Sequence, residues 1–535
     1  MFKRLVIKPN SYHDSIVLMR LARTVRNIDK VVAAQVGMAT ELNKDAVREM
    51  GFVSQELETS TANDLIVAVV AEAEDAIDNA EEVIKESLEG SARQEPGVKG
   101  AEIYATLSEA AAVGGAGIAA ISVPGEYAAR EAREALAGGL HVFLFSDNVS
   151  IEDEVRLKKS GKEKGLFVMG PDCGTAVIGG LGLGSANKVR SGRIGIVAAA
   201  GTGLQQVMAI IDRLGEGISE AIGTGGRDLS KEVGGITTFM GLDFLESDPN
   251  TAVKVLISKP PYPSVRDNLI RMLEDGAKPA VVCFMGEETE EARRSRSGKV
   301  LFAGDLEEAA ILAYQLTTGE SKESLYSCDE LDEMARRVAK TVDGGGYFRG
   351  LYSGGTLCHE TLTILRRMGI DVYSNIAQDR RLLIEDPLES LANTCIDMGE
   401  DYFTRGKPHP MLDPGMRVPR YIAEAGRKDV GILLFDVVLG YGCHRDPAGV
   451  MAEAVREAGR IRKDMGQGLA QIAVIVGTAG DPQGLEKQAA VLREAGAQVL
   501  SSNRAAGDLV ARIIKAQAGA RRQRISGEMA ASCPW

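Results

Sequence analysis

The sequence has few aromatic residues, few histidines and no closely spaced cysteines. Only 5% of its 535 residues are aromatic, while 61 are glycine. This balance favours an α/β protein with many tight strand-to-helix turns over an all-β sandwich. The seven cysteines include no C-x-x-C pair, which predicts reduced thiols rather than a disulfide framework or a zinc knuckle. The five histidines are too dispersed to predict a metal site from their spacing.

A long apolar run and an excess of positive charge are also missing. We find no stretch of about 18 apolar residues and no signal-peptide pattern at the N-terminus, so we expect a cytoplasmic protein without a membrane partner. The formal net charge of -13 argues against nucleic acid as the main partner. An anionic ligand would therefore be held by local features, such as backbone amides at helix N-termini.

The chain is too long for a single hydrophobic core. Residues 1–95 mix strand-like and helical runs and predict a small α+β domain of ferredoxin-like character. Strand–helix units then alternate, which implies parallel sheets. We predict a Rossmann-like domain of the CoA-binding type at 96–190, a ligase-like flavodoxin domain at 191–325, a linker at 326–345, a second ligase-like flavodoxin domain at 346–518 and a flexible tail at 519–535.

Two glycine-containing turns each follow an apolar strand and open a helix. Gly201, Thr202 and Gly203 follow the strand IGIVA, and Gly440 and Gly442 follow ILLFDVV. Free amides and the positive end of the helix dipole attract phosphoryl or carboxylate groups, and glycine lets them approach the backbone. We therefore predict both turns as phosphate-binding, with ligand-free tight turns as the alternative.

Other polar residues are expected to line the same sheet edges. His444 and His409 are candidates for acid–base catalysis. Asp446 could orient His444 or cap the helix that begins near Pro447. Cys173 could be a nucleophile, but no histidine is near it in sequence, which favours a structural thiol. The predicted substrate-binding residues are Asp172, Cys173, Gly225, Gly226, Arg227 and Arg445.

Several longer motifs carry a family resemblance. MGPDCGTAVIGG, GRIGIVAAAGTGLQQVM and AIGTGGRDLSKEVGG resemble the α subunit of succinyl-CoA synthetase, and ILLFDVVLGYGCHRDP resembles the ligase domain of its β subunit. VIKPNSYHDSIVLM, SVPGEYAAREAREAL and HPMLDP point to the FdrA family, whose members are acyl-CoA-synthetase-like. The resemblance covers essentially the whole chain. It implies an α/β fold of tandem parallel-sheet Rossmann-like and flavodoxin-like domains behind the small N-terminal domain.

Three features depart from the synthetase pattern. Residues 283–310 contain no histidine, although the synthetases carry a phosphohistidine in the corresponding Gly-His-Ala-Gly segment. No glycine-rich turn for CoA phosphates precedes Gly100, so we expect no required cofactor, with CoA as an optional ligand. Residues 320–346 leave room only for a connector, where the synthetases have an ATP-grasp domain.

The resemblance therefore implies chemistry that needs no nucleotide in this chain. FdrA-family proteins are associated with oxamate carbamoyltransferase in allantoin catabolism and act with companion subunits, which implies carbamoyl phosphate and a small amide such as oxamate as substrates of an oligomer. Thr202 and the loop amides would hold the phosphate, and Arg227 or Arg445 would stabilise developing charge. One alternative is an NDP-forming acyl-CoA synthetase, such as a succinate–CoA ligase, whose histidine and nucleotide-binding domain are supplied by a partner. The other alternative is a non-catalytic subunit.

Overall fold

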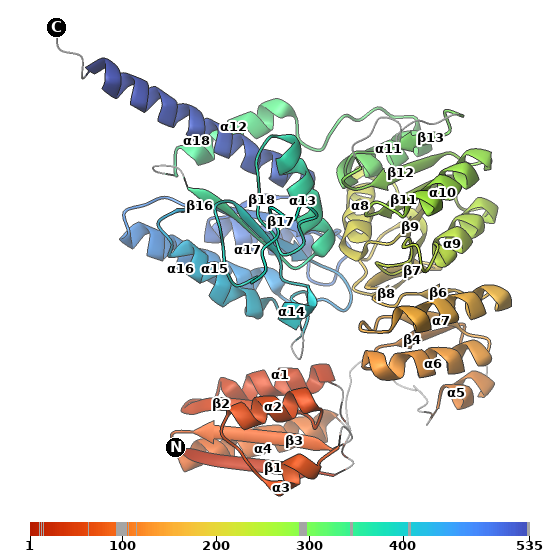
Figure 1. The fold of residues 1–535 in the computed structure, drawn as a ribbon, viewed down its shortest axis with the longest axis vertical. Helices are drawn as coiled ribbons and strands as arrows, with labels where there is room; N and C mark the ends of the chain where they lie inside the picture. The colour runs from red at the N-terminus through yellow and green to blue at the C-terminus, as the bar shows by residue number, and fades with distance from the viewer. Residues whose placement is uncertain are drawn as a thin grey trace. The chain divides into compact units, whose positions relative to one another are not determined.

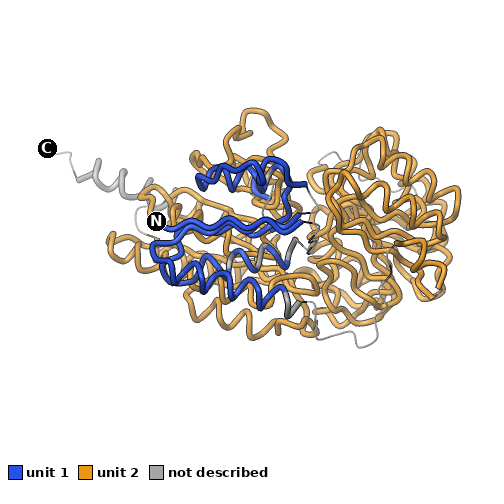
Figure 2. Tube along the Cα trace, turned by 90° about the horizontal axis from the view of Figure 1, so that it is seen from below, with its two compact units in different colours: residues 1–103, 403–408 blue, residues 104–402, 409–535 orange. Residues whose placement is uncertain are grey.

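Figure 1 shows the fold of the chain in a computed structural model. The structure describes residues 1–531 except residues 10, 12, 14, 62–63, 92–103, 105, 114, 288–296, 343–345 and 405–407. The chain divides into two compact units, coloured separately in Figure 2. Unit 1 consists of residues 1–103 and 403–408, and unit 2 consists of residues 104–402 and 409–535.

Unit 1 contains an antiparallel sheet with helices on both faces. Its described strands, in the order β1-β3-β2, are β1 (Phe2–Lys8), β3 (Leu65–Ala71) and β2 (Val31–Met38). The central strand β3 is buried along its whole length, as its continuous apolar sequence LIVAVVA requires. One face packs against α1 and α4 and the other against α2 and α3. The helices are α1 (Ser15–Arg26), α2 (Glu41–Glu49), α3 (Gln55–Thr59) and α4 (Glu74–Ser91). The small N-terminal domain expected from the sequence is present.

Unit 2 opens with a small parallel sheet. Its strands are β4 (Ile118–Ile121), β5 (His141–Leu144) and β6 (Val168–Met169), in sequence order. The accompanying helices are α5 (Leu107–Val113), α6 (Gly125–Ala137) and α7 (Ile151–Lys164). Helix α7 begins at the capping residue Ser150 and ends at Gly165 in the left-handed conformation, two ordinary helix boundary signals.

A larger sheet follows, with the strand order β13-β12-β11-β9-β10-β7-β8. Its strands are β7 (Thr175–Ile178), β8 (Leu181–Gly184), β9 (Ser191–Ala198), β10 (Ile218–Gly223), β11 (Val253–Ser258), β12 (Ala280–Phe284) and β13 (Val300–Phe302). Strands β9 to β13 are parallel, and the hairpin β7–β8 joins them antiparallel to β10. The sheet therefore starts at Thr175, ahead of the boundary that we placed between residues 190 and 191. Its helices are α8 (Gly201–Leu214), α9 (Ile236–Ser247), α10 (Pro263–Asp275) and α11 (Leu306–Thr318).

The last sheet is parallel throughout, in the order β15-β14-β16-β17-β18. Its strands are β14 (Tyr347–Tyr352), β15 (Thr394–Asp397), β16 (Val430–Val438), β17 (Ala470–Val476) and β18 (Gln498–Leu500). The helices of this part are α12 (Cys328–Ala339), α13 (Gly355–Arg367), α14 (Asp401–Thr404), the short 3-10 helix η2 (Pro414–Arg417), α15 (Val418–Ala425), α16 (Pro447–Asp464), α17 (Leu485–Ala495) and α18 (Asn503–Ala531).

One hydrophobic cluster contains side chains from both larger sheets of unit 2 and from α8 and α13, which contact each other (Figure 1). These two helices follow the carboxyl ends of β9 and β14, where open α/β sheets commonly bind ligands. The predicted α/β fold with tandem parallel sheets is confirmed. In the described parts of the chain, no helix has the length and apolar character needed to cross a membrane.

Candidate functional site

Helix α8 begins at the first of the two predicted phosphate turns. Its N-cap residue is Ala200, and no side chain caps the helix start, so the first-turn amides lack a side-chain acceptor. Thr202 is buried in this turn. A Cβ on Gly201 would meet only the Cα of Gly174, at 4.0 Å, which leaves open space beside the amides. The start of α8 thus keeps both the positive dipole end and the access that an anion needs.

Helix α13 begins in the same way, at the carboxyl end of β14. Its N-cap residue Gly354 also lacks a side-chain cap. The two helix starts touch: a Cβ on Gly354 would lie 2.8 Å from the Oγ1 of Thr202, and a Cβ on Gly203 would lie 2.7 Å from the Cγ2 of Thr356. Two N-termini of like partial charge therefore meet, and a partly buried N-terminus can stabilise an anion by up to ~2 kcal/mol. The junction of α8 and α13 is the candidate anion site.

Asp436, toward the carboxyl end of β16, fixes the loop that leads into α13. Its carboxylate accepts hydrogen bonds from the Ser353 amide at 2.7 Å, from the Ser353 hydroxyl at 2.8 Å and from the Gly354 amide at 2.8 Å. It is fully buried and pairs with the buried Arg417 at 2.7 Å. A buried carboxylate is tolerated when it is paired and hydrogen-bonded in this way. Asp436 therefore positions the helix start rather than facing a ligand itself.

Asp397 ends β15 and lies beside the same helix start. A Cβ on Gly355 would collide with its Oδ2, so this position of α13 requires glycine. The Gly399 amide donates to Oδ1 at 2.9 Å. Burial raises the pKa of Asp397 to about 7, against the opposing effects of the Gly399 hydrogen bond and the Lys259 charge. A carboxyl group that titrates near neutrality beside an anion site is suited to proton transfer.

His409, one of the two predicted acid–base histidines, lies near Asp397 across Gly399. A Cβ on Gly399 would be 2.7 Å from the Nε2 of His409 and 3.2 Å from the Oδ1 of Asp397. The Met411 amide donates to Nδ1 of the ring at 3.2 Å, so the neutral ring carries its proton on Nε2. Burial lowers the pKa of His409 to about 4. At neutral pH His409 is therefore a neutral hydrogen-bond donor rather than a base.

Lys259, the residue that follows β11 in the seven-stranded sheet, adds a cation whose charge acts on Asp397. Its side chain is exposed. Its charge reinforces the effect of burial in lowering the pKa of His359, and it opposes the effect of burial on the pKa of Asp397. Neither Lys259 nor Gly354 was predicted from the sequence as a site residue. The signal that could have found both is the one used for Gly201, since all three follow the carboxyl end of a parallel strand.

The predicted substrate loops around Asp172 and Gly225 lie together. Gly225 packs against the Pro171 carbonyl with no room for a side chain, and a Cβ on Gly226 would lie 3.8 Å from the Oδ2 of Asp172. Burial, with added repulsion from Asp147, raises the pKa of Asp172 to about 6. The loop near Gly201 thus contains a second carboxyl group with a raised pKa.

Two of the predicted substrate-binding residues near these loops, Cys173 and Arg227, have structural roles. Burial raises the pKa of the Cys173 thiol to about 12, so it is not a thiolate at neutral pH, which supports the structural interpretation. Arg227 pairs with the buried Glu154 at 2.9 Å and donates to the Val149 carbonyl at 2.8 Å. Its charge is therefore used within the protein.

The second predicted phosphate turn, at Gly440 and Gly442, makes contacts within the protein instead. The Gly440 amide donates to the Oε1 of Gln483 at 3.1 Å, and the Tyr441 amide donates to the Ala186 carbonyl at 2.8 Å. Gly440 and Gly442 both lie too close to residues 184–187, at and just after the end of β8, for any side chain. These contacts join the two larger sheets, and the amides are occupied by the protein. We therefore no longer assign this turn a phosphate.

The polar residues after this turn are also accounted for. Asp446 caps α16 by accepting from the Gly449 amide at 3.1 Å, the second of the two roles considered for it. His444 donates its amide to the Met411 carbonyl at 2.9 Å, and its Nδ1 accepts from the Asp446 amide at 3.1 Å. Arg445 is exposed. Among the predicted residues, the structure brings Gly201, Thr202, Gly203 and His409 to the α8–α13 junction.

Three family models match the chain. The model described as "AllF, heavy metal-associated domain" matches residues 1–104, "CoA binding domain" matches 189–286 and "CoA-ligase" matches 351–513. The CoA-binding match covers α8, and it falls almost entirely beyond the segment 96–190 for which we predicted a domain of that type. The open amides of α8 fit a phosphate group of CoA as well as that of an acyl phosphate. The CoA-ligase match contains α13, Asp397 and His409.

Fold and family models together define a protein with succinyl-CoA-synthetase-like CoA-binding and CoA-ligase domains. The chain is 40% identical over 514 residues to "Uncharacterized protein YahF" of Escherichia coli, covering 96% of this chain and 98% of that protein, and it belongs to the same family. It is 28% identical over 172 residues to the succinate–CoA ligase subunit alpha 2 of Archaeoglobus fulgidus, covering 30% of this chain and 56% of that protein. A dinucleotide-forming acetyl-coenzyme A synthetase of Ca. Korarchaeum cryptofilum gives a TM-score of 0.34 at 17% identity, covering 81% and 90% of the two chains.

The heavy-metal description does not fit the residues of unit 1. Heavy metals prefer thiolate and imidazole ligands. Residues 1–104 contain no cysteine and a single histidine, His13, whose Nε2 lies 3.1 Å from the Ser11 hydroxyl. Within the described ranges, no three His, Cys, Asp or Glu side chains are grouped so that they could hold a metal ion. We derive no metal chemistry for unit 1.

Proposed function

We propose that the chain is a subunit of an enzyme that transfers a carbamoyl group between carbamoyl phosphate and a small amide such as oxamate. The observation that carries the proposal is the junction of two uncapped helix starts, α8 and α13, beside a carboxyl group with a pKa of about 7. Carbamoyl phosphate is an acyl phosphate, so the transfer step needs neither a nucleotide nor a phosphohistidine. Companion subunits, an oligomeric complex and a cytoplasmic location belong to the same proposal.

The helix starts hold the phosphate group in this mechanism. The first-turn amides of α8 and α13 donate to its oxygens, with the Thr202 hydroxyl as a further donor and Lys259 as the cation. The amide nitrogen of the acceptor attacks the carbamoyl carbon, a C–N bond forms and the bond between that carbon and the phosphate oxygen breaks. Phosphate leaves with the electron pair of the broken bond. Fixed dipoles aimed at the leaving group stabilise the charge that develops on it.

Asp397 is the proton acceptor in this mechanism. The attacking amide loses one N–H proton, which the ionised form of Asp397 accepts, and a pKa of about 7 leaves a large ionised fraction at neutral pH. In the reverse direction the protonated carboxyl returns it. His409, neutral with its proton on Nε2, donates a hydrogen bond to the carbamoyl oxygen as negative charge develops there.

Phosphate release tests this proposal. The purified chain with its companion subunits, supplied with carbamoyl phosphate, should release phosphate only when oxamate is added. No release above background would overturn the proposal. An acid-labile phosphoenzyme formed from ATP, CoA and succinate would support the acyl-CoA synthetase alternative instead.

A further inference from the structure

A buried glutamate in α13 connects the two helix starts of the candidate anion site. Glu360 lies in the second turn of α13 and is only 2% exposed. One of its carboxyl oxygens accepts from the Leu306 amide, at the start of α11, at 2.8 Å. The Leu306 side chain reaches the first turn of α8, because a Cβ on Gly203 would lie 3.4 Å from its Cδ2. Glu360 therefore links α13, through α11, to the first turn of α8.

The other oxygen of Glu360 connects it to the strand that leads into α13. The side-chain nitrogen of Asn503, the first residue of α18, donates to that oxygen at 2.8 Å and to the Leu357 carbonyl at 2.9 Å. The side-chain oxygen of Asn503 accepts from the Tyr352 hydroxyl at 2.8 Å. Tyr352 is the last residue of β14, directly before the turn that opens α13. Both helix starts are thus tied to one carboxyl group.

The charged groups around Glu360 are mostly acidic. Asp305 and Glu307 are buried, and both repel a charge on Glu360. Arg504 lies 3.4 Å from Asp305 and 3.5 Å from Glu307, so its charge is shared by those two carboxylates. Among the described residues Glu360 has no ion-pair partner. The charged and titratable groups of this cluster come from α11 and the loop before it, from α18, from α13 and from β12, and they are Asp305, Glu307, Glu308, Arg504, Arg367 and Cys283.

The Glu360 carboxyl group is mostly uncharged at neutral pH. Burial, with added repulsion from Asp305, raises its pKa to about 8. The hydrogen bonds from Asn503 and Leu306 oppose this rise, because these donors favour the charged form. An ionised Glu360 would be a buried charge without a counter-ion, which is costly unless water reaches it.

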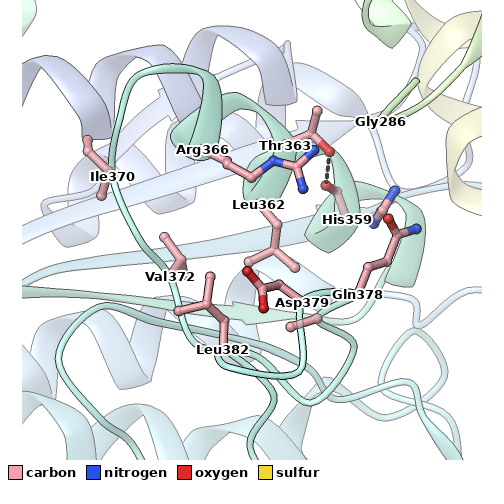
Figure 3. Close-up of a pocket in the computed structure, with 11 residues that line it drawn as sticks. Gly286, His359, Leu362, Thr363, Arg366, Ile370, Val372, Gln378, Asp379 and Leu382 are labelled. Atoms are coloured by element: carbon pink, nitrogen blue, oxygen red, sulfur yellow. Dashed lines mark hydrogen bonds between the residues drawn. The ribbon is translucent and has the colours of Figure 1, made fainter. Parts of the chain in front are cut away.

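The opposite face of α13 gives the helix room to move. A cavity of about 40 Å³ is lined there by His359, Leu362, Thr363 and Arg366 (Figure 3). With 3.6 residues per turn, these residues lie on the side of the helix that faces away from Glu360. Close-packed interiors resist displacement, whereas a void with room for about three water molecules lets a neighbouring element shift. A shift of α13 toward the cavity would let water reach Glu360.

We propose that Glu360 is the positioning residue of the phosphate site: its uncharged carboxyl group holds the starts of α8 and α13 together, and its ionisation separates them. This inference rests on the proposed function, because the phosphate group of the carbamoyl donor is the ligand that the joined helix starts hold.

The direction of the pH effect follows from the two forms of the site. In the separated form Glu360 is hydrated and has its ordinary pKa of 4.5, so separation releases a proton. The stability of the joined form is therefore complete below pH 4.5 and is lost as the pH rises through 8. Between these values separation becomes roughly tenfold more favourable for each pH unit. Above pH 8 both forms are ionised and the change ends.

Calorimetric titration of the whole chain with sulfate, at a series of pH values, tests the inference. Sulfate is a tetrahedral dianion like phosphate, but it does not titrate in this range. Between about pH 6 and 9 the wild-type affinity should fall roughly tenfold or more beyond the fall in Glu360→Gln. The glutamine cannot ionise, and its side-chain oxygen can still accept from the Leu306 amide. Asp397, with its pKa of about 7, causes the fall that both proteins share.

A second variant and a matched control complete the experiment. Asp305→Asn removes a charge that repels Glu360, and asparagine can still cap α11. Its sulfate affinity should fall less than that of the wild type, because the pKa of Glu360 is then lower. Glu220→Gln is the control, since burial also raises the pKa of this β10 carboxyl group, which accepts from the Gly179 amide at 2.8 Å. It should reproduce the wild-type profile.

Two outcomes overturn the inference: equal falls in the wild type and Glu360→Gln, or no sulfate binding by the wild type at pH 6. Its failure can be told apart from failure of the proposed function. If phosphate release depends on oxamate while Glu360→Gln keeps the wild-type pH profile, the transfer reaction stands and Glu360 does not control the site. If the sulfate profiles differ as predicted but the complex releases no phosphate, the role of Glu360 stands and the transfer reaction falls.

Discussion

Replacing Gly354 by alanine should separate the two helix starts that form the candidate phosphate site. The new Cβ would lie 2.8 Å from both the Oγ1 and the Cγ2 of Thr202 and 2.9 Å from its Cβ. Carbon atoms in favourable contact stay about 3.5–4.0 Å apart. The backbone at Gly354, with φ −104° and ψ 108°, is extended and open to alanine. The perturbation is therefore steric and falls on Thr202.

Thr202 has little freedom to give way, because it is buried and β-branched. Overpacking of this kind lowers the free energy of unfolding by about 1–3 kcal/mol. A displacement of about 1 Å at a catalytic site reduces the rate by roughly a hundredfold. Thr202→Ala removes two of the three clashing atoms, so the double variant should recover most of the stability lost in Gly354→Ala. We expect a favourable coupling free energy of about 1–2 kcal/mol between the two substitutions.

The assay is a double-mutant cycle. Urea unfolding and calorimetric phosphate affinity are measured for the wild type, Gly354→Ala, Thr202→Ala and the double variant. Gly459→Ala is the matched control, because a Cβ there, in the interior of α16, would lie 3.9 Å from the Nε2 of Gln471 and should stabilise the helix by up to ~1 kcal/mol. Additive effects of the two substitutions, or wild-type phosphate affinity in Gly354→Ala, would refute the reasoning.

Three other substitutions test separate parts of the account. The folded pKa of Asp397, about 7, exceeds its ordinary value of 3.8, so its contribution to stability is complete below pH 3.8 and is lost as the pH rises through 7. Between these pH values the free energy of unfolding, measured by urea titration, should therefore fall less in Asp397→Asn than in the wild type. Parallel curves of unfolding free energy against pH for the two proteins would contradict this. Asp436→Ala should lower the free energy of unfolding by roughly 3–5 kcal/mol, because it leaves Arg417 buried without its partner; a loss below about 1 kcal/mol would show that the pair is not needed. Gly440→Ala should destabilise the fold by about 1–3 kcal/mol, because φ is +127° and the Ala186 carbonyl oxygen would lie 2.5 Å from the new Cβ. Its phosphate affinity should stay at the wild-type value. A loss of phosphate affinity would show that this turn is part of the phosphate site.

The parallel sheets could be predicted from the sequence, because their strands are long apolar runs. IGIVA and GILLFDVV read as strands buried on both faces, and the structure buries both. The hairpin of β7 and β8 was not predicted, because each strand is only 4 residues long and lacks such a run. The expected domain boundary at residues 190 and 191 therefore falls inside the sheet. Local periodicity also carries no information on which sheet a hairpin joins.

Half of the candidate site followed from the sequence and half did not. Gly201 to Gly203 were found because a glycine turn directly follows a strand. A glycine turn after a strand also occurs at Ser353 to Gly355. The turn at Gly440 shows this pattern too, and we predicted it as the second phosphate-binding turn instead of Ser353 to Gly355. The turns at Gly440 and Gly354 differ in their tertiary contacts. The Gly440 turn packs against Gln483 and residues 184–187, whereas Gly354 packs against Thr202 at the start of α8. The raised pKa of Asp397 likewise depends on burial that one sequence does not reveal.

A crystal structure of the protein with bound phosphate is the most direct test of the central claim. The account predicts one anion at the junction of α8 and α13, in contact with the Thr202 hydroxyl and with the amide of Gly355. Phosphate found only at the turn of Gly440 and Gly442, or none at the helix starts at saturating concentration, would contradict it.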